Sequence, residues 1–533
     1  MQKIKLILVV KKLSIAIVAV CLPCILYAQS PDISRQAKAP NILFCIADDA
    51  SYQYMSTYGT PWVKTPNIDR IAKEGLLFMK AYTPNAKCSP SRACILTGRN
   101  PWQLEAAANH APFFPVKFTT YVEALSNNGY DVGYTGKGWA PGVAKDAVGK
   151  DRMLTGLQYN QIKREAPAKG ISGIDYTANF EAFLIRKTKD KPFCFWYGGI
   201  EPHRDYEYAS GVSIGKKKLS DITKVPPFYP DNEKVRNDML DYAYEVEYFD
   251  FHIGKMLDVL EKRGDLANTI IVITSDNGMP FPRVKGHVYE EANHMPLAVM
   301  WQSGIKNPGR KIDDFVSFID FAPTFLEAAG VKSNSGMQAM TGKSLINIFQ
   351  SSKSGKVDSS RDHVLLGKER TDVGRPNDAG YPVRGIIKGN FIYAINYEPS
   401  RYPAGNPETG YLDTDGSPTK TVILEEKRSG KNTVNWKLAF GKKGAEELYQ
   451  VEKDPYSMNN LADNKSYEKI KKALRMQMEK ELREQKDPRI FGKGYVFDAY
   501  PYSNDKVKGF YERKMKGEKM NTEWVNQSDF EKQ

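Results

Sequence analysis

The stretch Asn-Ile-Leu-Phe-Cys-Ile-Ala-Asp-Asp, residues 41–49, decides the fold class. Its apolar run has no alternation of polar and apolar residues, which predicts a strand that is covered on both faces. Similar runs alternate with amphipathic stretches farther along, as in a parallel sheet with helices on both sides. We therefore predict an α/β fold, in which helices sandwich a mainly parallel sheet within residues 40–345. The expected strands are 41–47, 131–135, 192–197, 269–274 and 296–301, and the expected helices are 67–74, 120–127, 175–187, 237–262 and 321–329.

The sequence changes character after about residue 343. Strand-like pieces at 383–388 and 391–397 precede a charged helical pattern at 466–485. This order predicts a smaller C-terminal α+β subdomain over residues 360–490. Residues 491–533 form a C-terminal extension. Its end mixes acidic and basic residues, and we expect that end to be solvated.

Composition narrows the class of protein. The chain has 533 residues, 41% hydrophobic and 26% charged, which is enough apolar content for a large core and excludes a disordered chain. Six cysteines are too few for a disulfide scaffold. The net charge of +13 is spread along the chain, without zinc-finger spacing or a long basic run. We expect no nucleic-acid partner, and the positive balance fits an anionic small molecule or glycan.

The N-terminus has the layout of a secretory signal peptide. Lys3, Lys5, Lys11 and Lys12 precede an apolar run over 13–27, and Ala28 is followed by polar residues. We predict a signal peptide at 1–28, cleavage after Ala28, and a periplasmic or secreted bacterial protein. A retained anchor is the alternative, but the run is shorter than the ~20 apolar residues that a span needs. We expect no stable membrane insertion of the mature chain.

Acidic residues follow two of the expected strands. Asp48 and Asp49 come directly after the first, and Asp276 and Asn277 follow the strand at 269–274. The carboxyl ends of parallel strands meet at one edge of a sheet, where ligands collect. Three carboxylates and an amide oxygen suit Ca²⁺ or Mg²⁺. The alternative is a pair of ordinary strand-end turns.

The segment Cys-Ser-Pro-Ser-Arg-Ala-Cys-Ile-Leu-Thr-Gly-Arg, residues 88–99, resembles the signature of the type I sulfatases. In that family the first Cys of C-x-P-x-R is oxidised to formylglycine. The resemblance implies an alkaline-phosphatase-like fold and a formylglycine-generating maturation enzyme as partner. It also implies one Ca²⁺ ion held by a shared set of residues: Asp48, Asp49, Cys88, Asp276 and Asn277.

The resemblance extends to further catalytic residues. It implies that the hydrated aldehyde at Cys88 attacks sulfur, while Arg92, Lys137 and Lys285 hold the sulfuryl oxygens. His203 resembles the family histidine that protonates the leaving group, a role that suits a side chain with a pKa near ~6.5.

One position departs from the family pattern. Many members read G-K-x-H, where the histidine helps to eliminate sulfate, but this chain has Trp139 there. We predict His110 as the replacement base. His287 and His294 are expected to contact substrate. A dense polar loop at 368–378 either reaches the pocket from the C-terminal subdomain or is solvated.

The motifs around Asp276 and His203 resemble the heparan N-sulfatase (N-sulfoglucosamine sulfohydrolase) branch and bacterial glycan sulfatases. We therefore predict an exported carbohydrate sulfatase that hydrolyses a sulfate ester or sulfamate of a sulfated glycan, including glycosaminoglycans. Two alternatives stay open: a phosphoesterase of the same superfamily, and a non-catalytic binder of sulfated glycans, which Trp139 would favour.

Overall fold

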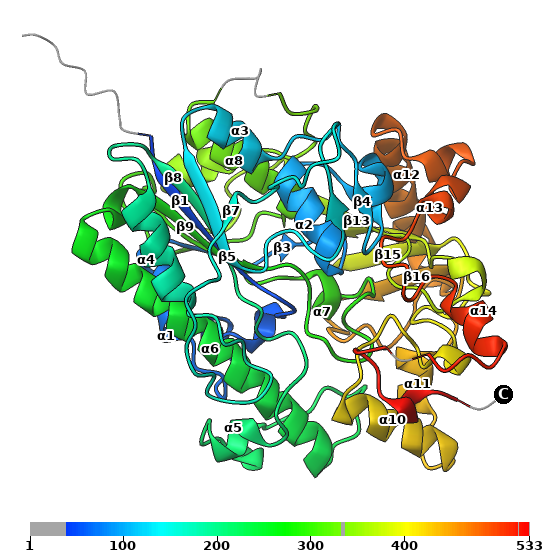
Figure 1. Cartoon of the computed structure of the whole chain (residues 1–533). Helices are drawn as coiled ribbons and strands as arrows, with labels where there is room; N and C mark the ends of the chain where they lie inside the picture. The colour runs from blue at the N-terminus through cyan, green and yellow to red at the C-terminus, as the bar shows by residue number, and fades with distance from the viewer. Residues whose placement is uncertain (1–38, 332–335, 521, 532–533) are drawn as a thin grey trace, which may run out of the picture. The chain divides into compact units, whose positions relative to one another are not determined.

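The stretch that begins at Asn41 forms the central part of the largest sheet. A computed structural model describes residues 39–331, 336–520 and 522–531 (Figure 1), so the predicted leader at 1–28 lies outside the described residues. Eight strands make up this sheet. Their order is β11 (Arg310–Ile312), β2 (Leu76–Phe78), β10 (Ala298–Met300), β9 (Thr269–Ser275), β1 (Asn41–Ala47), β8 (Phe193–Gly198), β5 (Asp131–Gly136) and β7 (Leu157–Gln158).

The sheet is mainly parallel, as the sequence predicts. β1 runs parallel to β8 and β9, β5 runs parallel to β8 and β7, and β11 runs parallel to β2. The exception is β10, which is antiparallel to both of its neighbours. All the carboxyl ends of β1, β8, β9 and β5 therefore face the same edge, which is where ligands are expected to bind.

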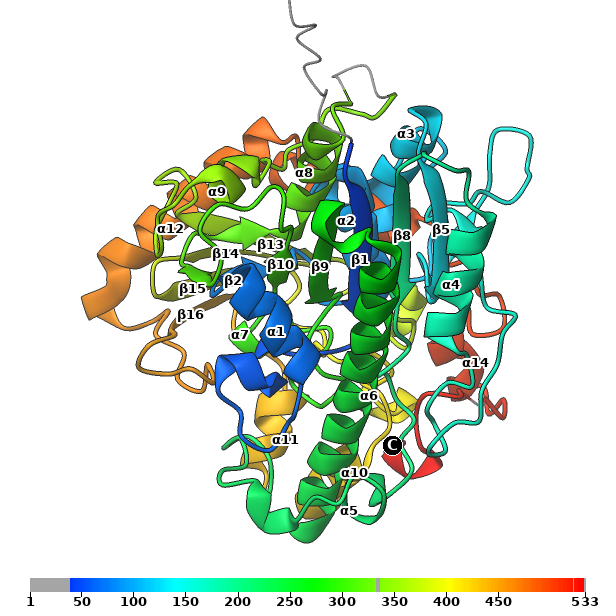
Figure 2. The ribbon, with the colours of Figure 1, turned by 90° about the vertical axis from the view of Figure 1, so that its left-hand side faces the viewer.

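Both faces of the sheet are covered. Alternate residues of β1 belong to two different cores: Leu43 faces one and Phe44 faces the other. The first core also contains residues of α1 (Pro66–Glu74), α4 (Tyr176–Arg186) and α6 (Glu233–Arg263), the side seen in Figure 2. The second contains residues of α2 (Cys88–Thr97), α3 (Tyr121–Asn127) and α8 (Phe321–Ala328). This arrangement explains the continuous apolar run at 42–47, because a strand with two buried faces needs no polar side.

The longest helix has clear boundary signals. The side chain of Asn232 accepts a hydrogen bond from the N–H of Val235 (3.1 Å), which caps the start of α6. Gly264 ends the helix with φ 71°, a conformation that favours glycine. The four cysteines among the described residues are buried and free of disulfides. Among these residues, no helix combines the length and apolar character that a membrane crossing requires.

A smaller antiparallel sheet follows in the C-terminal part. Its order is β13 (His363–Lys368), β14 (Val383–Lys388), β15 (Phe391–Asn396) and β16 (Glu446–Gln450). Leu474, Met478 and Leu482 of α12 (Glu468–Glu484) share a core with residues of this sheet. The predicted strands at 383–388 and 391–397 and the predicted helix are therefore present, whereas β13 and β16 were not predicted.

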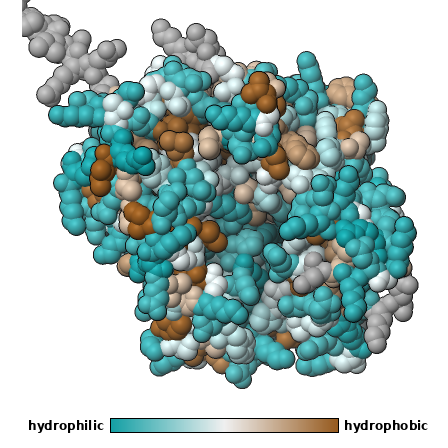
Figure 3. All heavy atoms as spheres, in the orientation of Figure 1, coloured by the Kyte–Doolittle hydropathy of each residue, from teal (hydrophilic) through white to brown (hydrophobic). Residues whose placement is uncertain are grey.

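The remaining elements are short and lie mostly in connections. They are β3 (Ala81–Tyr82), β4 (Phe113–Phe114), β6 (Val143–Ala144), β12 (Val316–Ser317), α5 (Ser210–Ser213), α7 (Glu290–Asn293), α9 (Ile346–Gln350), α10 (Pro418–Arg428), α11 (Val434–Ala439), α13 (Tyr495–Ala499) and α14 (Phe510–Met515). On the face shown in Figure 3, hydrophilic side chains predominate and apolar ones occur in small groups.

The C-terminal end differs from expectation. We predicted a solvated segment, but Val507, Phe510, Met520 and Val525 are buried, in a cluster that also contains Leu412. The sequence did not reveal this cluster, because its apolar positions are far apart and lie among acidic and basic residues. The extension is therefore a packed part of the molecule.

Candidate active site

The acidic strand ends meet at one edge of the large sheet. β1 and β9 are adjacent and in register, with Ala47 opposite Ser275, so the residues that follow them converge. The backbone N–H of Asp49 donates to Asp276 Oδ1 (3.1 Å), and Asn277 Nδ2 donates to Asp49 Oδ1 (2.6 Å). These side chains and that of Asp48 are buried. The structure thus brings together the four oxygen-bearing residues predicted to hold a cation.

Helix α2 presents Cys88 to this acidic cluster. Cys88 is the first residue of the helix, and its Sγ lies 4.0 Å from Asp49 Oδ1. Arg92 comes one turn later and therefore lies on the same side of the helix. It is fully buried, and its Nε donates to Asp276 Oδ2 (2.8 Å). The spacing of Cys88 and Arg92 thus places both beside the carboxylates.

Two lysines and a histidine lie beside the carboxylates. Lys137 follows β5, and its Nζ lies 2.6 Å from Asp48 Oδ2. Lys285 Nζ lies 2.7 Å from Asp49 Oδ2. His203, beyond the end of β8, has its Nε2 3.8 Å from Asp49 Oδ2. All the catalytic residues predicted around Cys88 by family resemblance are therefore neighbours in space.

The donor set fits a hard divalent cation. Asp48, Asp49 and Cys88 each place a possible ligand atom within 4.8 Å of the others. Asn277 Oδ1 is buried and accepts no hydrogen bond, although its amide nitrogen is bonded. A buried carbonyl oxygen without a donor is costly unless another group binds it. Together with the carboxylates, it supplies oxygen ligands of the kind that Ca²⁺ prefers.

The pKa values of Asp48 and Asp276 are shifted in opposite directions. Burial by itself raises the pKa of Asp48, but Lys137, His203 and Arg92 hold that pKa well below its ordinary value. Burial and the charge of Asp48 raise the pKa of Asp276 to about 7. For Lys137, burial lowers the pKa, but the effect of nearby carboxylates is larger and the pKa is raised. This lysine is therefore charged at neutral pH and able to hold an anion.

His110 lines the same cavity as Cys88 and pairs with a different carboxylate, that of Asp372. Its Nδ1 is 2.8 Å from Asp372 Oδ1, while its Nε2 is buried and has no hydrogen-bond partner. Burial lowers the pKa of His110, against the opposing effect of Asp372. Asp372 also pairs with Nζ of Lys87 (2.8 Å), the residue directly before Cys88 in the sequence. A neutral imidazole held at Nδ1 by a carboxylate leaves Nε2 able to accept a proton.

Trp139 has a different environment from the histidine that it replaces in the family pattern. Its Nε1 donates to the carbonyl oxygen of Ser89 (3.1 Å), in the first turn of α2. Its ring packs edge-to-face on Phe114, with centroids 5.2 Å apart. Trp139 therefore supports the helix that carries Cys88, and it is absent from the wall of the active-site cavity.

A cavity of about 640 Å³ contains this site. Its wall includes five predicted residues, Cys88, His110, Lys137, His203 and Lys285. It also includes residues that sequence reasoning missed: Lys87, Asp415, Tyr502, Asn504, Lys506 and Trp524. The position of Lys87 directly before the Cys88 motif was an available signal. The others come from distant C-terminal segments that carry no recognisable pattern.

The polar loop at 368–378 reaches the cavity through Asp372. Lys368 to Val373 are buried, so the solvated alternative is wrong for this half of the loop. His287 and His294 do not line the cavity. His287 stacks on Tyr289 and His294 stacks on Tyr52, with centroids 5.6 and 3.7 Å apart. The structure therefore does not bring these two histidines to the place where substrate contacts are expected.

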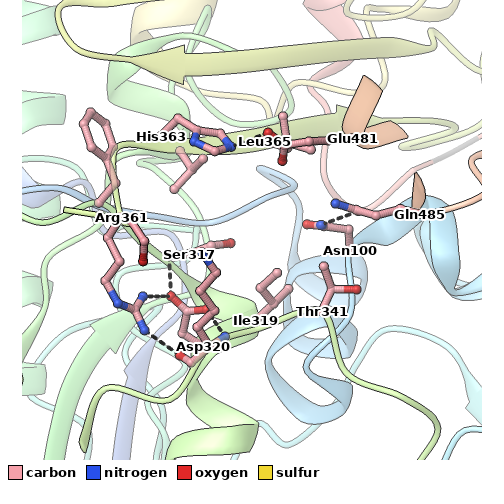
Figure 4. Close-up of a pocket in the computed structure, with 14 residues that line it drawn as sticks. Asn100, Ser317, Ile319, Asp320, Thr341, Arg361, His363, Leu365, Glu481 and Gln485 are labelled. Carbon is pink, nitrogen blue, oxygen red and sulfur yellow. Dashed lines mark hydrogen bonds and ion pairs between the residues drawn. The ribbon is translucent and has the colours of Figure 1, made fainter. Parts of the chain in front are cut away.

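A second polar cavity, of about 140 Å³, lies apart from these residues (Figure 4). Four of its lining side chains form two pairs: Arg361 with Asp320 (2.7 Å) and His363 with Glu481 (2.7 Å). Glu481 belongs to α12, and Asp320 precedes α8. These pairs link the smaller sheet and its helix to the helical layer of the large sheet.

Comparisons with known proteins agree with this geometry. Residues 40–331, more than half of the chain, match the family model described as Sulfatase. An ulvan-active sulfatase of Formosa agariphila is 28% identical, over 83% of this chain and 79% of that protein. The N-sulphoglucosamine sulphohydrolase of Homo sapiens is 26% identical, over 85% of this chain and 92% of that protein.

An N-acetylglucosamine-6-O-sulfatase of Bacteroides thetaiotaomicron is 27% identical, over 85% of this chain and 88% of that protein. A solved structure of a protein in complex with its substrate, D-glucosamine-2-N,6-O-disulfate, has the same fold. Its TM-score is 0.61 at 23% identity, with coverage of 84% of this chain and 99% of that chain. The family match decides for the sulfatase prediction over the phosphoesterase alternative. The protein belongs to the sulfatase family and is a hydrolase of sulfuric esters or sulfamates.

Proposed function

We propose that this sulfatase is an exported bacterial enzyme that removes sulfate from a saccharide of a sulfated glycan, either as an ester or as a sulfamate. The named relatives act on ulvan, on N-sulphoglucosamine and on N-acetylglucosamine 6-sulfate, which supports a carbohydrate substrate. The observation that carries the proposal is the convergence of three buried carboxylates and three cationic side chains on Cys88.

Each residue around Cys88 has a distinct role in the proposal. Lys137 and Lys285 hold the oxygens of the sulfate group, and Arg92 fixes Asp276 in the cluster. His203 donates a proton to the leaving oxygen or nitrogen of the sugar. Formylglycine at Cys88 would supply, once hydrated, a hydroxyl group that attacks sulfur. Ca²⁺, bound by Asp48, Asp49, Asp276 and Asn277 beside residue 88, would lower the pKa of that hydroxyl.

His110 is the proposed base that takes the role of the histidine missing at Trp139. Asp372 holds Nδ1, so that the free Nε2 can accept a proton inside the cavity. The pairing of a carboxylate with one ring nitrogen fixes the tautomer and the orientation of the ring. This pair therefore provides a base in a cavity that also contains Lys87, Lys137 and Lys285.

The proposal includes export of the protein to the periplasm or the medium. It is supported by the apolar run at 13–27 and the Ala28 junction. N-terminal sequencing of the protein recovered from the periplasm of a bacterial host should begin at Gln29. A mature protein that still begins with Met1 would contradict the predicted cleavage.

The main test combines modification and turnover. The protein is produced with a formylglycine-generating enzyme, and the mass of the Cys88 peptide is measured. Sulfate release is then assayed on glucosamine, galactosamine, galactose and uronic-acid fragments that carry N- or O-sulfate. We expect the aldehyde mass and release from at least one fragment. Binding of these fragments by calorimetry without any release would instead support the non-catalytic binder.

A further inference from the structure

The active-site cavity has one wall that the sulfatase motifs do not supply. Tyr502, Asn504, Lys506 and Trp524 line it together with Cys88 and the catalytic lysines. All four belong to the C-terminal extension, which lies far beyond the matched residues 40–331.

Trp524 is held in place by two backbone hydrogen bonds. Its Nε1 donates to the carbonyl oxygen of Leu412 (2.9 Å), and its own carbonyl oxygen accepts from the N–H of Gly416 (2.7 Å). The loop between these partners carries Asp415, whose Oδ2 lies 2.9 Å from Lys285 Nζ. The position of the indole is thus tied to the loop that pairs with a catalytic lysine.

The part of the extension around Tyr502 is anchored beside His110. Tyr502 OH donates to Asp372 Oδ1 (3.2 Å), the oxygen that also faces His110. The N–H of Ser503 donates to the carbonyl oxygen of Ala111 (2.9 Å). Deeper in the protein, Lys420 and Asp529 form a fully buried ion pair at 3.2 Å. The segment is therefore fixed at both ends of the stretch that faces the cavity.

The cavity lining consequently contains two chemically different sets of side chains. Lys87, Lys137 and Lys285 suit a sulfate group. Apolar surface comes from Ala111, Pro141, Val143 and the partly exposed ring of Trp524. A sulfated sugar has the same division, because its sulfate is anionic and its ring presents apolar C–H groups.

We propose that the C-terminal extension forms the saccharide-binding wall of the active site, with Trp524 as the platform on which the sugar ring of the substrate stacks. The proposal rests on the proposed function, since it requires a carbohydrate substrate. Trp524 contributes to binding of the sugar ring, whereas Lys87, Lys137 and Lys285 bind the sulfate group. The two contributions can therefore be separated by measurement.

The first test compares Trp524→Ala, Trp524→Phe and a control, Trp436→Ala. Trp436 is also partly buried and donates its Nε1 to Tyr411 OH (2.9 Å), but it lies outside the cavity. Trp524→Ala should raise the KM for the best sulfated saccharide about tenfold, which corresponds to about 1.4 kcal/mol of lost ring contact. Competitive inhibition by inorganic sulfate should change less than about twofold. Trp524→Phe should retain most of the affinity, and Trp436→Ala should match the parent.

The inference is overturned if Trp524→Ala leaves KM unchanged, or if it weakens saccharide and inorganic sulfate equally. A second measurement does not depend on turnover or on the folding of the Ala variant. Saccharide binding to the Cys88→Ala protein should change its tryptophan fluorescence, and the additional substitution Trp524→Phe should remove that change. An unaltered fluorescence response would also overturn the inference. A parent enzyme that releases no sulfate from any saccharide would instead contradict the proposed function.

Discussion

The two sides of the cavity are built in different ways. The sulfate side is assembled from strand ends and the first turn of α2, all within the matched residues 40–331. Its side chains are buried and pair with one another, as Lys137 does with Asp48. The wall formed by the C-terminal extension is fixed by a few hydrogen bonds, such as that from Trp524 to Leu412. The core of the fold thus places the reacting groups, and an added segment shapes the surface offered to the sugar.

This difference predicts different responses to substitution. Removing one member of a buried charged cluster leaves its partners unpaired, which is strongly unfavourable. Replacing the Trp524 ring removes a contact with the ligand and one hydrogen bond, to the carbonyl oxygen of Leu412, but leaves no buried charge unpaired. Changes on the sulfate side should therefore affect turnover, whereas changes on the saccharide side should affect substrate affinity.

Cys88→Ala should have the largest effect. Without a thiol no formylglycine can form, and we expect sulfate release to fall by at least about 10³-fold, to the background of the assay. Cys94→Ala is the matched control, because Cys94 is buried in the same helix but does not line the cavity. It should retain turnover at the cost of some thermal stability. Substantial sulfate release by Cys88→Ala would contradict the proposed formylglycine mechanism.

Asn277→Leu should come next, through loss of the metal. Its Oδ1 has no partner in the protein, so the substitution removes a proposed ligand without breaking a hydrogen bond to that oxygen. We expect roughly a 10²-fold fall in turnover. Thermal unfolding supplies an independent readout: Ca²⁺ at about 100 times its dissociation constant should stabilise the parent by about 2.7 kcal/mol. Neither chelator nor Ca²⁺ should shift the variant, and an unchanged Ca²⁺ response would argue against this ligand.

The comparison also explains what could be predicted from the sequence. The apolar strand at 41–47 and the acids that follow it suffice to predict the sheet and its ligand-binding edge, because the carboxyl ends of parallel strands lie at the same edge of a sheet. The catalytic residues around Cys88 were predicted from local motifs, several of which lie next to a strand or helix end. Their roles remain predictions, but the structure does bring them together.

The wall formed by Trp524 could not be predicted in this way. Its position depends on contacts with Leu412 and Gly416, more than a hundred residues earlier, and no local periodicity reports such contacts. The mixed charges after residue 505 indicated a solvated segment, although the buried Lys420 and Asp529 are charged residues that pair in the interior. A buried ion pair can be recognised only when the positions of both charged residues in the structure are known.

His110→Gln should lower turnover by about 10²-fold, the usual contribution of a general base. Because burial lowers the pKa of His110, the histidine stays in its basic form below pH 6.5, and the acidic limb of the pH profile should lie below that value. Asp372→Asn should reduce turnover less. Asp372 raises the pKa of His110, so its loss should move the limb to still lower pH.

A control for His110 is His287→Gln, since His287 is also buried, its pKa is lowered by burial, and it lies outside the cavity. This variant should leave the pH profile unchanged. If Asp372→Asn lowers turnover without moving the acidic limb, Asp372 has only a structural role and the proposed pair with His110 is wrong.

Asp529→Ala should have the smallest effect on turnover, although it tests how the saccharide wall is anchored. It leaves the buried Lys420 without its carboxylate partner, with only the carbonyl oxygens of Gly410, Tyr411 and Thr414 to accept from Nζ, which should cost about 3 kcal/mol of unfolding free energy. At temperatures where the variant stays folded, kcat should be unchanged and the KM for saccharide should rise by about threefold, since Trp524 is fixed mainly by other contacts.

The loss of stability in Asp529→Ala should also depend on pH. Burial lowers the pKa of Lys420, against the effect of Asp529, so the substitution lowers that pKa further. The folded protein then binds fewer protons than the unfolded chain, and stability should rise with pH as Lys420 becomes neutral. Thermal unfolding at several pH values measures this slope. Lys427→Ala, which breaks the half-exposed pair with Glu531, should change stability by no more than about 1 kcal/mol. Equal losses in the two variants would show that the buried pair does not anchor the wall.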